Sequence, residues 1–277
     1  MPDELTVFEQ LAYSTVRIES KKANGDTSVG TGFFFRFKED ENGTHIPAIV
    51  TNKHVVHDAE RVFFRLTLKS EEGEPLISQH HTFQLIVQGQ FTIPHPNPEI
   101  DLCIYPIAPL IHRAELEGNK FYYIGLQRDL IPSESDLDEM FGMDEITMVG
   151  YPMGIWDEVH NFPVLRRGIT ATNPKYDWNG RREFLIDCAC FPGSSGSPVF
   201  LLNVGGYYTR TGMHMGGIRL KFLGILYAGP QYTSEGQIRI VDIPVNQVPI
   251  PISSVPSNLG NVLKSELLLD FESVLDA

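Results

Sequence analysis

The sequence predicts an all-β protein built from two units of antiparallel strands, with a short helix near each end. Three observations support this prediction. Short apolar segments rich in Val, Ile, Phe, Tyr and Thr recur along the chain. The 24 glycines and 19 prolines are spread between these segments, as expected for strands joined by turns. A stretch crowded with carboxylates divides the segments into two series.

The first series occupies the first half of the chain. Asn42-Gly43 is typical of a tight hairpin turn and lies between two of its segments. A short helix is expected before the series, at 4–12. Strands are expected at 16–19, 32–37, 48–51, 61–68 and 82–87, where β-branched and aromatic residues predominate.

The second series follows residues 128–139. That segment holds Pro132, two serines and five carboxylates, and is therefore predicted to be a solvated connection between two units. Beyond it, strands are expected at 145–149, 164–171, 184–188, 198–202, 223–226 and 238–243.

The end of the chain combines a proline-dotted segment, 244–256, with an apolar stripe at helical spacing in 259–275. This pattern predicts a helix that either packs on the β body or docks a partner or a second copy of the chain. The expected domains are 1–127 for the N-terminal helix and first unit, 128–143 for the connection, 144–250 for the second unit, and 251–277 for the C-terminal linker and helix.

Composition argues against several classes of protein. Hydrophobic residues make up 42% and charged residues 21% of the 277, so the chain is expected to fold around a sizeable core. A net charge of −13 argues against nucleic acid or an anionic membrane as a partner. The three cysteines lack the spacing of a disulfide framework, and neither a signal peptide nor a long apolar run is apparent. A cytoplasmic protein is therefore expected.

The segment 191–198 reads Phe-Pro-Gly-Ser-Ser-Gly-Ser-Pro and carries the strongest chemical signal. Gly193 and Gly196 flank Ser195, so the serine can lie on a tight turn with its hydroxyl exposed. Backbone N–H groups then converge on one hollow that can hold an oxyanion. Such a loop, taken alone, is more often a simple turn.

A serine needs a base before it becomes a strong nucleophile. His54 is the first candidate because it follows an apolar, strand-like segment; His57, three residues later, is the alternative. An acid must also hold the imidazole in one tautomer, and Asp101 fits because it opens an apolar run. Nothing in the sequence brings Asp58 or Asp187 to His54.

Three motifs, in this order along the chain, resemble the catalytic motifs of trypsin-like (chymotrypsin-fold) serine proteases, with bacterial non-secreted members and Deg-type proteases closest. The resemblance implies two antiparallel β-barrels of the chymotrypsin type and a serine endopeptidase that forms an acyl-enzyme intermediate. The motifs are Thr51-Asn52-Lys53-His54-Val55-Val56, Asp101-Leu102-Cys103-Ile104 and Gly193-Ser194-Ser195-Gly196-Ser197-Pro198.

By this resemblance, Ser195 attacks a carbonyl carbon, His54 accepts and returns the proton, and Asp101 orients His54. The N–H groups of Gly193 and Ser195 form the oxyanion hole. The expected partner is a polypeptide substrate. No cofactor is expected, and no metal ion, because paired Cys/His spacing is absent.

Two departures from the family pattern matter. Ser194 stands where members activated by cleavage carry an aspartate, so no zymogen step of that kind is expected. Ala189 stands where trypsin-like members carry the acid that selects a basic side chain, so a small or apolar residue is expected before the cleaved bond. The residues expected to line that pocket are Ala189, Cys190, Tyr227 and Ala228.

Alternatives remain at this stage. The chain can be a trypsin-like fold that binds peptides or acts as a scaffold, with low or conditional peptidase activity. Cys190 is a weaker candidate nucleophile than Ser195, which occupies the motif position. An α/β-hydrolase is disfavoured because Ser197 interrupts the Gly-x-Ser-x-Gly motif and because the order His, Asp, Ser is reversed in that fold.

Overall fold

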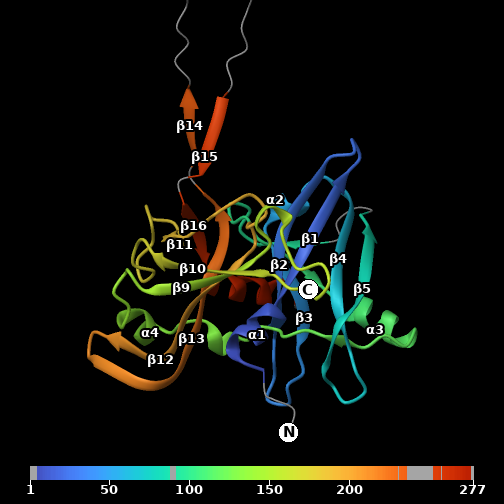
Figure 1. Ribbon diagram of the computed structural model, residues 1–277, viewed down its shortest axis with the longest axis horizontal. Helices are drawn as coiled ribbons and strands as arrows, with labels where there is room; N and C mark the ends of the chain where they lie inside the picture. Colours follow the sequence, from blue (N-terminus) through green and yellow to red (C-terminus); the bar gives the residue numbers. More distant parts are fainter. Residues whose placement is uncertain (1–4, 88–91, 230, 236–251, 257, 276–277) are drawn as a thin grey trace, which may run out of the picture.

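The computed structural model describes residues 5–87, 92–229, 231–235, 252–256 and 258–275. It consists mainly of antiparallel strands in two large sheets that lie side by side (Figure 1), which confirms the predicted all-β architecture. In the described part of the chain no helix has both the length and the apolar character needed to cross a membrane.

The first sheet begins after α1 (Val7–Ala12), where Thr6 and Glu9 form a capping box. Its strands pair in the order β5-β4-β1-β2-β3-β7-β6, with β8 paired to β4, and α2 (Lys53–Val56) follows β3. The strands are β1 (Thr15–Lys22), β2 (Thr27–Phe37), β3 (Ile46–Thr51), β4 (Ala59–Lys69), β5 (Pro75–Ile86), β6 (Ile93–Pro94), β7 (Cys103–Pro106) and β8 (Phe121–Tyr122).

Besides the four-residue α2, two helices were not expected from the sequence. α3 (Ala108–Leu116) fully buries only Ala114 and packs Leu110 and Ile111 partly against the core, so its apolar stripe is too short to reveal it. α4 (Glu134–Asp138) lies within the predicted connection, after the turn η1 (Arg128–Leu130), and begins at a capping box formed by Ser133 and Asp136. The connection is therefore partly helical.

The second sheet is a closed barrel in the order β10-β11-β16-β13-β12-β9. A separate pair of strands, β14 (Gln231–Glu235) and β15 (Ile252–Pro256), extends away from it (Figure 1). The strand expected at 238–243 lies outside the described residues. The barrel elements are β9 (Glu145–Gly150), η2 (Pro152–Gly154), β10 (Val164–Thr170), β11 (Glu183–Asp187), β12 (Pro198–Thr209), β13 (Gly212–Ala228) and β16 (Leu259–Lys264).

The prediction of a helix starting at residue 259 was wrong. Leu259–Lys264 forms β16, which pairs with both β11 and β13 and places Val262 opposite Phe184 and Leu226. Without β16, two neighbouring strands would leave their edge N–H and C=O groups unpaired, and this pairing outweighs the helical pattern. The second barrel thus includes a strand beyond residue 250, and the domain limits stay a proposal.

The helical part of the C-terminal segment is the 3-10 helix η3 (Ser265–Ser273). Its side chains Leu267, Leu268 and Phe271 are fully buried in a core cluster that both sheets share. This agrees with the packing interpretation of the segment, because these apolar groups are not free to dock a partner.

The shared core cluster fixes the two sheets relative to each other. Phe33 on β2 meets Phe222 on β13, with ring centroids 5.3 Å apart. Phe37 meets Phe271 of η3 at 6.0 Å. Aromatic side chains bury a large apolar area each, so this cluster holds the first sheet rigidly against the barrel. Residues contributed by both sheets can therefore form one site.

Candidate active site

His54 and Asp101 are brought together by the end of β3. The strand ends at Thr51, Asn52 is the N-cap of α2, and His54 lies in that single helical turn. His54 Nδ1 lies 2.5 Å from Asp101 Oδ2, and the His54 amide donates to Asp101 Oδ1 at 3.2 Å. Because a carboxylate accepts, Nδ1 carries the proton and Nε2 is the basic nitrogen.

The backbone around Asp101 is fixed by a second contact. Asn52 Nδ2 donates to the carbonyl of Asp101 at 2.7 Å, and Asn52 is fully buried. The His54 side chain nevertheless remains 49% exposed, which leaves the imidazole open to a bound molecule. The alternative, His57, instead pairs with the exposed Asp58 at 2.9 Å.

Ser195 lies in the loop between β11 and β12. Its carbonyl accepts from Thr31 N at 2.8 Å, and the next amide, that of Gly196, donates to Leu226 O at 2.8 Å. The loop is thus held between β2 of the first sheet and β13 of the barrel. Rigid supports on both sides of the loop leave the serine little freedom to move.

Gly196 shows how closely this loop approaches the strand end that leads to His54. A Cβ atom built on Gly196 would lie 1.9 Å from Thr31 O and 2.9 Å from Thr51 Oγ1. Ser195 therefore lies beside the end of β3. Among the described residues neither Ser195 Oγ nor His54 Nε2 has a hydrogen-bond partner. The hydrogen bond between a catalytic serine and its histidine is commonly long or absent before substrate binds.

The turn at Gly193 presents free backbone donors. Gly193 has φ +86°, and the preceding carbonyl, that of Pro192, accepts from Met153 N at 2.6 Å. Since a trans peptide directs its N–H opposite to its C=O, the Gly193 N–H points away from Met153. Within the described part of the chain, neither this N–H nor that of Ser195 donates to a protein acceptor. Two amides are thus available for an anion.

Thr31 connects the two sheets beneath this turn and is fully buried. Its hydroxyl donates to Gly193 O at 3.1 Å and accepts from Tyr151 N at 3.1 Å and Ser197 Oγ at 3.3 Å. Ser197 is therefore held in the loop by a side-chain hydrogen bond. The Thr31 side chain of the first sheet therefore contacts three residues around the serine loop, namely Gly193, Tyr151 and Ser197.

Arg166 is a site residue that the sequence did not indicate. It lies on β10, and its Nη1 donates to Ser194 Oγ at 2.9 Å and to Ala189 O at 2.6 Å. Its Nε and Nη2 are buried without a partner among the described residues. Burial lowers the pKa of this guanidinium. In the sequence, Arg166 was noticeable only as a charged residue inside the strand predicted at 164–171.

The four residues expected to line the substrate pocket occupy one end of the barrel. Cys190 lies against the end of β13, with its Cβ 3.8 Å from the Cβ built on Gly229, next to the exposed Ala228. Ala189 is half-buried, and its carbonyl is the one bound by Arg166.

Tyr227 is tied to the barrel rather than free in the pocket. Its hydroxyl donates to the carboxylate of Glu183, which is only 2% exposed. Burial and this bond raise the pKa of Tyr227 to about 12, so the hydroxyl stays protonated. Glu183 was not indicated by the sequence.

The described ranges contain no group of three or more His, Cys, Asp or Glu side chains placed to hold an ion. The chemistry available here is that of a hydroxyl, an imidazole, a carboxylate and two amides. These groups suit nucleophilic attack followed by stabilisation of an oxyanion.

Solved protein structures with a similar arrangement include several proteases. The active form of the Rv3671c protease from M. tuberculosis is 14% identical, with a TM-score of 0.44, and the match covers 93% of this chain and 78% of that one. The thermostable serine protease AL20 from an extremophilic microorganism is 12% identical, with a TM-score of 0.45 and coverage of 95% and 97%. Tobacco etch virus protease complexed with product is 14% identical, with a TM-score of 0.43 and coverage of 83% and 73%.

No curated protein matches the chain. The sequence model of the trypsin-like peptidase domain, in contrast, matches residues 30–205. That range contains His54, Asp101 and Ser195 together with the loops that hold them. Since it spans more than half of the 277 residues, the chain belongs to the trypsin-like peptidase domain family.

Proposed function

We propose that this protein is a serine endopeptidase that hydrolyses peptide bonds through Ser195, His54 and Asp101. The contact between His54 Nδ1 and Asp101 Oδ2 at 2.5 Å is the observation that carries this proposal. A carboxylate held against Nδ1 leaves Nε2 as a base, and the serine loop is clamped beside the same strand end. A protein that only binds peptides has no need of this alignment.

The reaction proceeds in two halves. Ser195 Oγ bonds to the substrate carbonyl carbon while its proton passes to His54 Nε2, and the amides of Gly193 and Ser195 bind the oxyanion. The C–N bond then breaks, and His54 gives the proton to the leaving amine. In the second half, His54 takes a proton from the water that attacks the acyl-enzyme, the bond from the acyl carbon to Ser195 Oγ breaks, and His54 returns the proton to Oγ. Asp101 orients the imidazole and stabilises the imidazolium whenever it forms.

Active-site labelling by a fluorophosphonate tests this proposal. The full chain is expected to label at a single serine, and labelling is expected to be lost in Ser195→Ala and in His54→Ala. Matched controls are Ser135→Ala, at an exposed serine, and His57→Ala, the exposed histidine three residues from His54; both are expected to label as the wild type.

Failure of the folded wild-type chain to label would contradict the proposal. Peptide binding without turnover, unchanged in Ser195→Ala, would instead support the alternative of a peptide-binding or scaffold module. Circular dichroism of each variant separates loss of the fold from loss of the nucleophile.

Cysteine chemistry gives a second test of the nucleophile. Burial raises the pKa of the Cys190 thiol to about 12, and the Cys103 thiol likewise to about 12. At pH 8 roughly one Cys190 in 10,000 is then a thiolate, the reactive form. We expect iodoacetamide at pH 8 to leave fluorophosphonate labelling within about twofold of the untreated protein.

Mass spectrometry of the treated protein checks this directly, with alkylation of the urea-unfolded chain as the positive control. Rapid alkylation of Cys190, together with peptidase activity that persists in Ser195→Ala and is lost in Cys190→Ala, would contradict serine as the nucleophile.

Two finer points belong to the same proposal. Ala189, Cys190, Tyr227 and Ala228 line the pocket for the residue before the cleaved bond, and a small or apolar side chain there is the expected preference. The protein is also proposed to act in the cytoplasm, because its three cysteines are free thiols. A secreted member of the family would be expected to form disulfides.

A further inference from the structure

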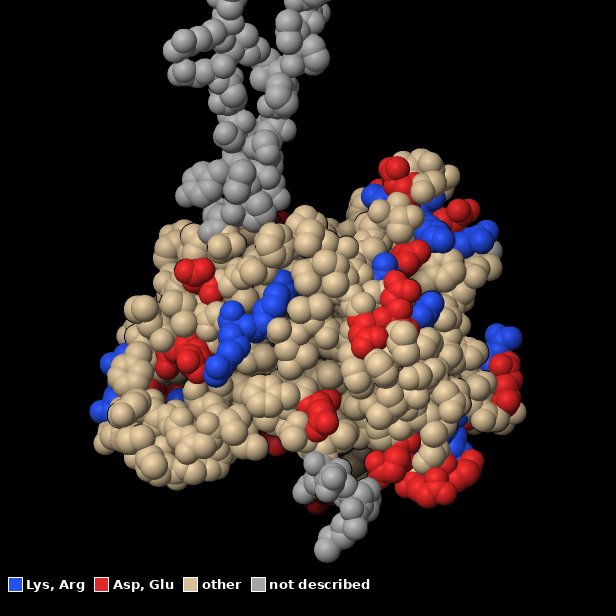
Figure 2. Space-filling view, viewed as in Figure 1, with Lys and Arg blue, Asp and Glu red and all other residues tan. Residues whose placement is uncertain are grey.

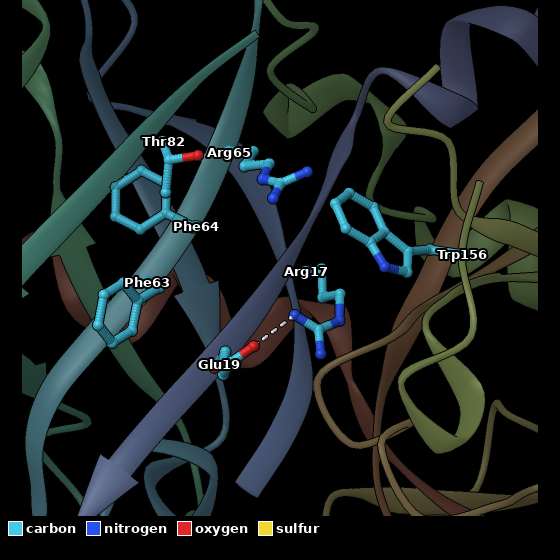
Figure 3. Close-up of a pocket in the computed structure, with 7 residues that line it drawn as sticks. All are labelled: Arg17, Glu19, Phe63, Phe64, Arg65, Thr82 and Trp156. Carbon is cyan, nitrogen blue, oxygen red and sulfur yellow. Dashed lines mark hydrogen bonds and ion pairs between the residues drawn. The ribbon is translucent and has the colours of Figure 1, made fainter. Parts of the chain in front are cut away.

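A second cavity, apart from the catalytic groups, lies where the barrel meets the outer face of the first sheet. It has a volume of about 180 Å³ and is lined by Arg17 and Glu19 of β1, by Phe63 and Arg65 of β4, and by Trp156 from the loop after η2 (Figure 3). We call it the Arg–Trp pocket. Both sheets contribute to it, as they do to the active site.

Two guanidinium groups face one indole in this pocket (Figure 3). The Cζ atom of Arg65 lies 4.9 Å from the Trp156 ring centroid and that of Arg17 lies 5.5 Å from it. Stacking against an aromatic face positions each guanidinium while its N–H donors remain in the plane, available to a ligand. The arrangement fixes two cations around one small volume.

These two cations exceed the negative charge beside them. Glu19 is the one carboxylate lining the pocket, and it contacts Arg17 at 3.0 Å and Lys21 at 3.6 Å. Arg65 makes no ion pair with any carboxylate in the described ranges; its nearest polar partner is His80 at 3.4 Å. In addition, Arg17 Nε is buried with no partner among those residues. An anion in the pocket would give Arg65 the charged partner that it lacks.

The acidic residue next to Trp156 forms no ion pair with either arginine in the described part of the chain. The Asp157 carboxylate accepts from the His160 ring at 2.7 Å and from the amides of Val159 and His160. These bonds lower the pKa of Asp157 and keep it engaged within its own loop. Figure 2 shows acidic and basic side chains interspersed over the viewed face, and the whole chain carries −13. A surplus of positive charge is thus a local property of the pocket.

The pocket is close to the oxyanion turn. Arg17 Nη2 lies 3.5 Å from a Cβ built on Gly154, and a Cβ built on Gly193 would lie 3.2 Å from Gly154 N. The pocket and the oxyanion turn are therefore separated only by the short segment that contains Gly154. The residue before the cleaved bond is proposed to lie at Cys190 and Ala228, whereas the pocket adjoins Gly154, which lies against Gly193. A substrate chain that runs from Cys190 past Gly193 would continue toward Gly154 and the pocket.

We propose that the Arg–Trp pocket is a subsite that binds a carboxylate of the polypeptide substrate, from an Asp or Glu side chain on the leaving-group side of the cleaved bond. The inference rests on the proposed function for its placement in the reaction. Arg65 supplies the unpaired charge, Arg17 adds a second positive charge, and Trp156 holds both. A charge-assisted contact in a half-buried site favours an acid over its amide by about tenfold or more.

Binding to the full chain tests this without any need for turnover. The chain has two tryptophans, so Trp178→Phe leaves Trp156 as the single fluorophore in the pocket. A hexaglutamate peptide is expected to change the Trp156 emission saturably and to bind about tenfold more tightly than hexaglutamine. Arg65→Gln is expected to abolish that difference. Arg61→Gln, an exposed arginine on the same strand outside the pocket, is expected to preserve it.

Equal binding of the two peptides, or equal losses in Arg65→Gln and Arg61→Gln, would overturn the subsite. If Arg65→Gln does not fold, Arg65→Lys keeps the charge but not the planar fork, and is expected to weaken hexaglutamate binding about threefold. Fluorophosphonate labelling of the same samples reports the proposed function separately. Acid-selective binding in a chain that does not label would refute the peptidase and leave the anion site standing.

Discussion

Alanine at position 193 is expected to lower kcat by about 100- to 1000-fold, the cost of losing one oxyanion donor. Gly193 has φ +86°, where an L side chain is strained by roughly 1–2 kcal/mol. A Cβ there would also lie 2.7 Å from Tyr151 O and 3.1 Å from Met153 N. Both atoms are backbone, so the peptide carrying the Gly193 N–H must move instead. The measurement is kcat on a peptide substrate, with the rate of fluorophosphonate labelling as a second readout.

Gly205→Ala is the matched control for this substitution. Gly205 has nearly the same φ, +88°, but no heavy atom lies within 4 Å of a Cβ built on it. It therefore carries the same backbone strain without the collision, and its kcat is expected to stay within about twofold of the wild type. Equal kcat in Gly193→Ala and the wild type would show that the turn does not bind the oxyanion.

The candidate catalytic residues could be proposed from the sequence because their signals are local. His54 and Asp101 follow or open apolar strand segments, and glycines around Ser195 mark a turn that other residue types disfavour. The structure brings His54 and Asp101 into contact, as expected. Whether these groups carry out the reaction stays a prediction until labelling is measured.

The C-terminal strand was not predictable in the same way. Six residues, Leu259–Lys264, with buried Val262 and Leu263, fit a helix or a strand equally well, because a short apolar run has no decisive period. The choice depends on two open edges, those of β11 and β13, which only the assembled barrel creates. Pairing with β11 and β13 therefore determined that this segment forms a strand.

Arg166 illustrates the other limit of sequence reasoning. Its partners, Ala189 and Ser194, are 23 and 28 residues away, and they meet Arg166 only because β10 packs beneath the serine loop. The sequence did indicate that Ser194 lacks the ion pair of cleavage-activated relatives. The sequence could not show that the guanidinium of Arg166, on a neighbouring strand, contacts Ser194 instead.

Substituting Arg166 by methionine is expected to lower kcat by about 100-fold, which corresponds to about 2.7 kcal/mol of transition-state stabilisation. Arg166 Nη1 holds Ser194 Oγ at 2.9 Å and Ala189 O at 2.6 Å, the residues on either side of the oxyanion turn. Losing both bonds frees the loop that carries Ser195. Arg167→Met is the control, because the neighbouring Arg167 side chain is 73% exposed and pairs with Glu145 on the surface; it is expected to leave kcat within about twofold.

Measuring thermal stability distinguishes a role of Arg166 in positioning the serine loop from a purely structural role. A buried guanidinium without a carboxylate partner costs folding free energy, so Arg166→Met removes that cost while it removes two hydrogen bonds. The two effects oppose each other, and Tm is expected to change by less than about 5 °C although kcat falls. In Arg166→Ala, which leaves a space, added guanidinium ion is expected to restore part of the rate. A large fall in Tm with no rescue would show that Arg166 supports the fold alone, whereas rescue would show that a cation at this place sets the loop for catalysis.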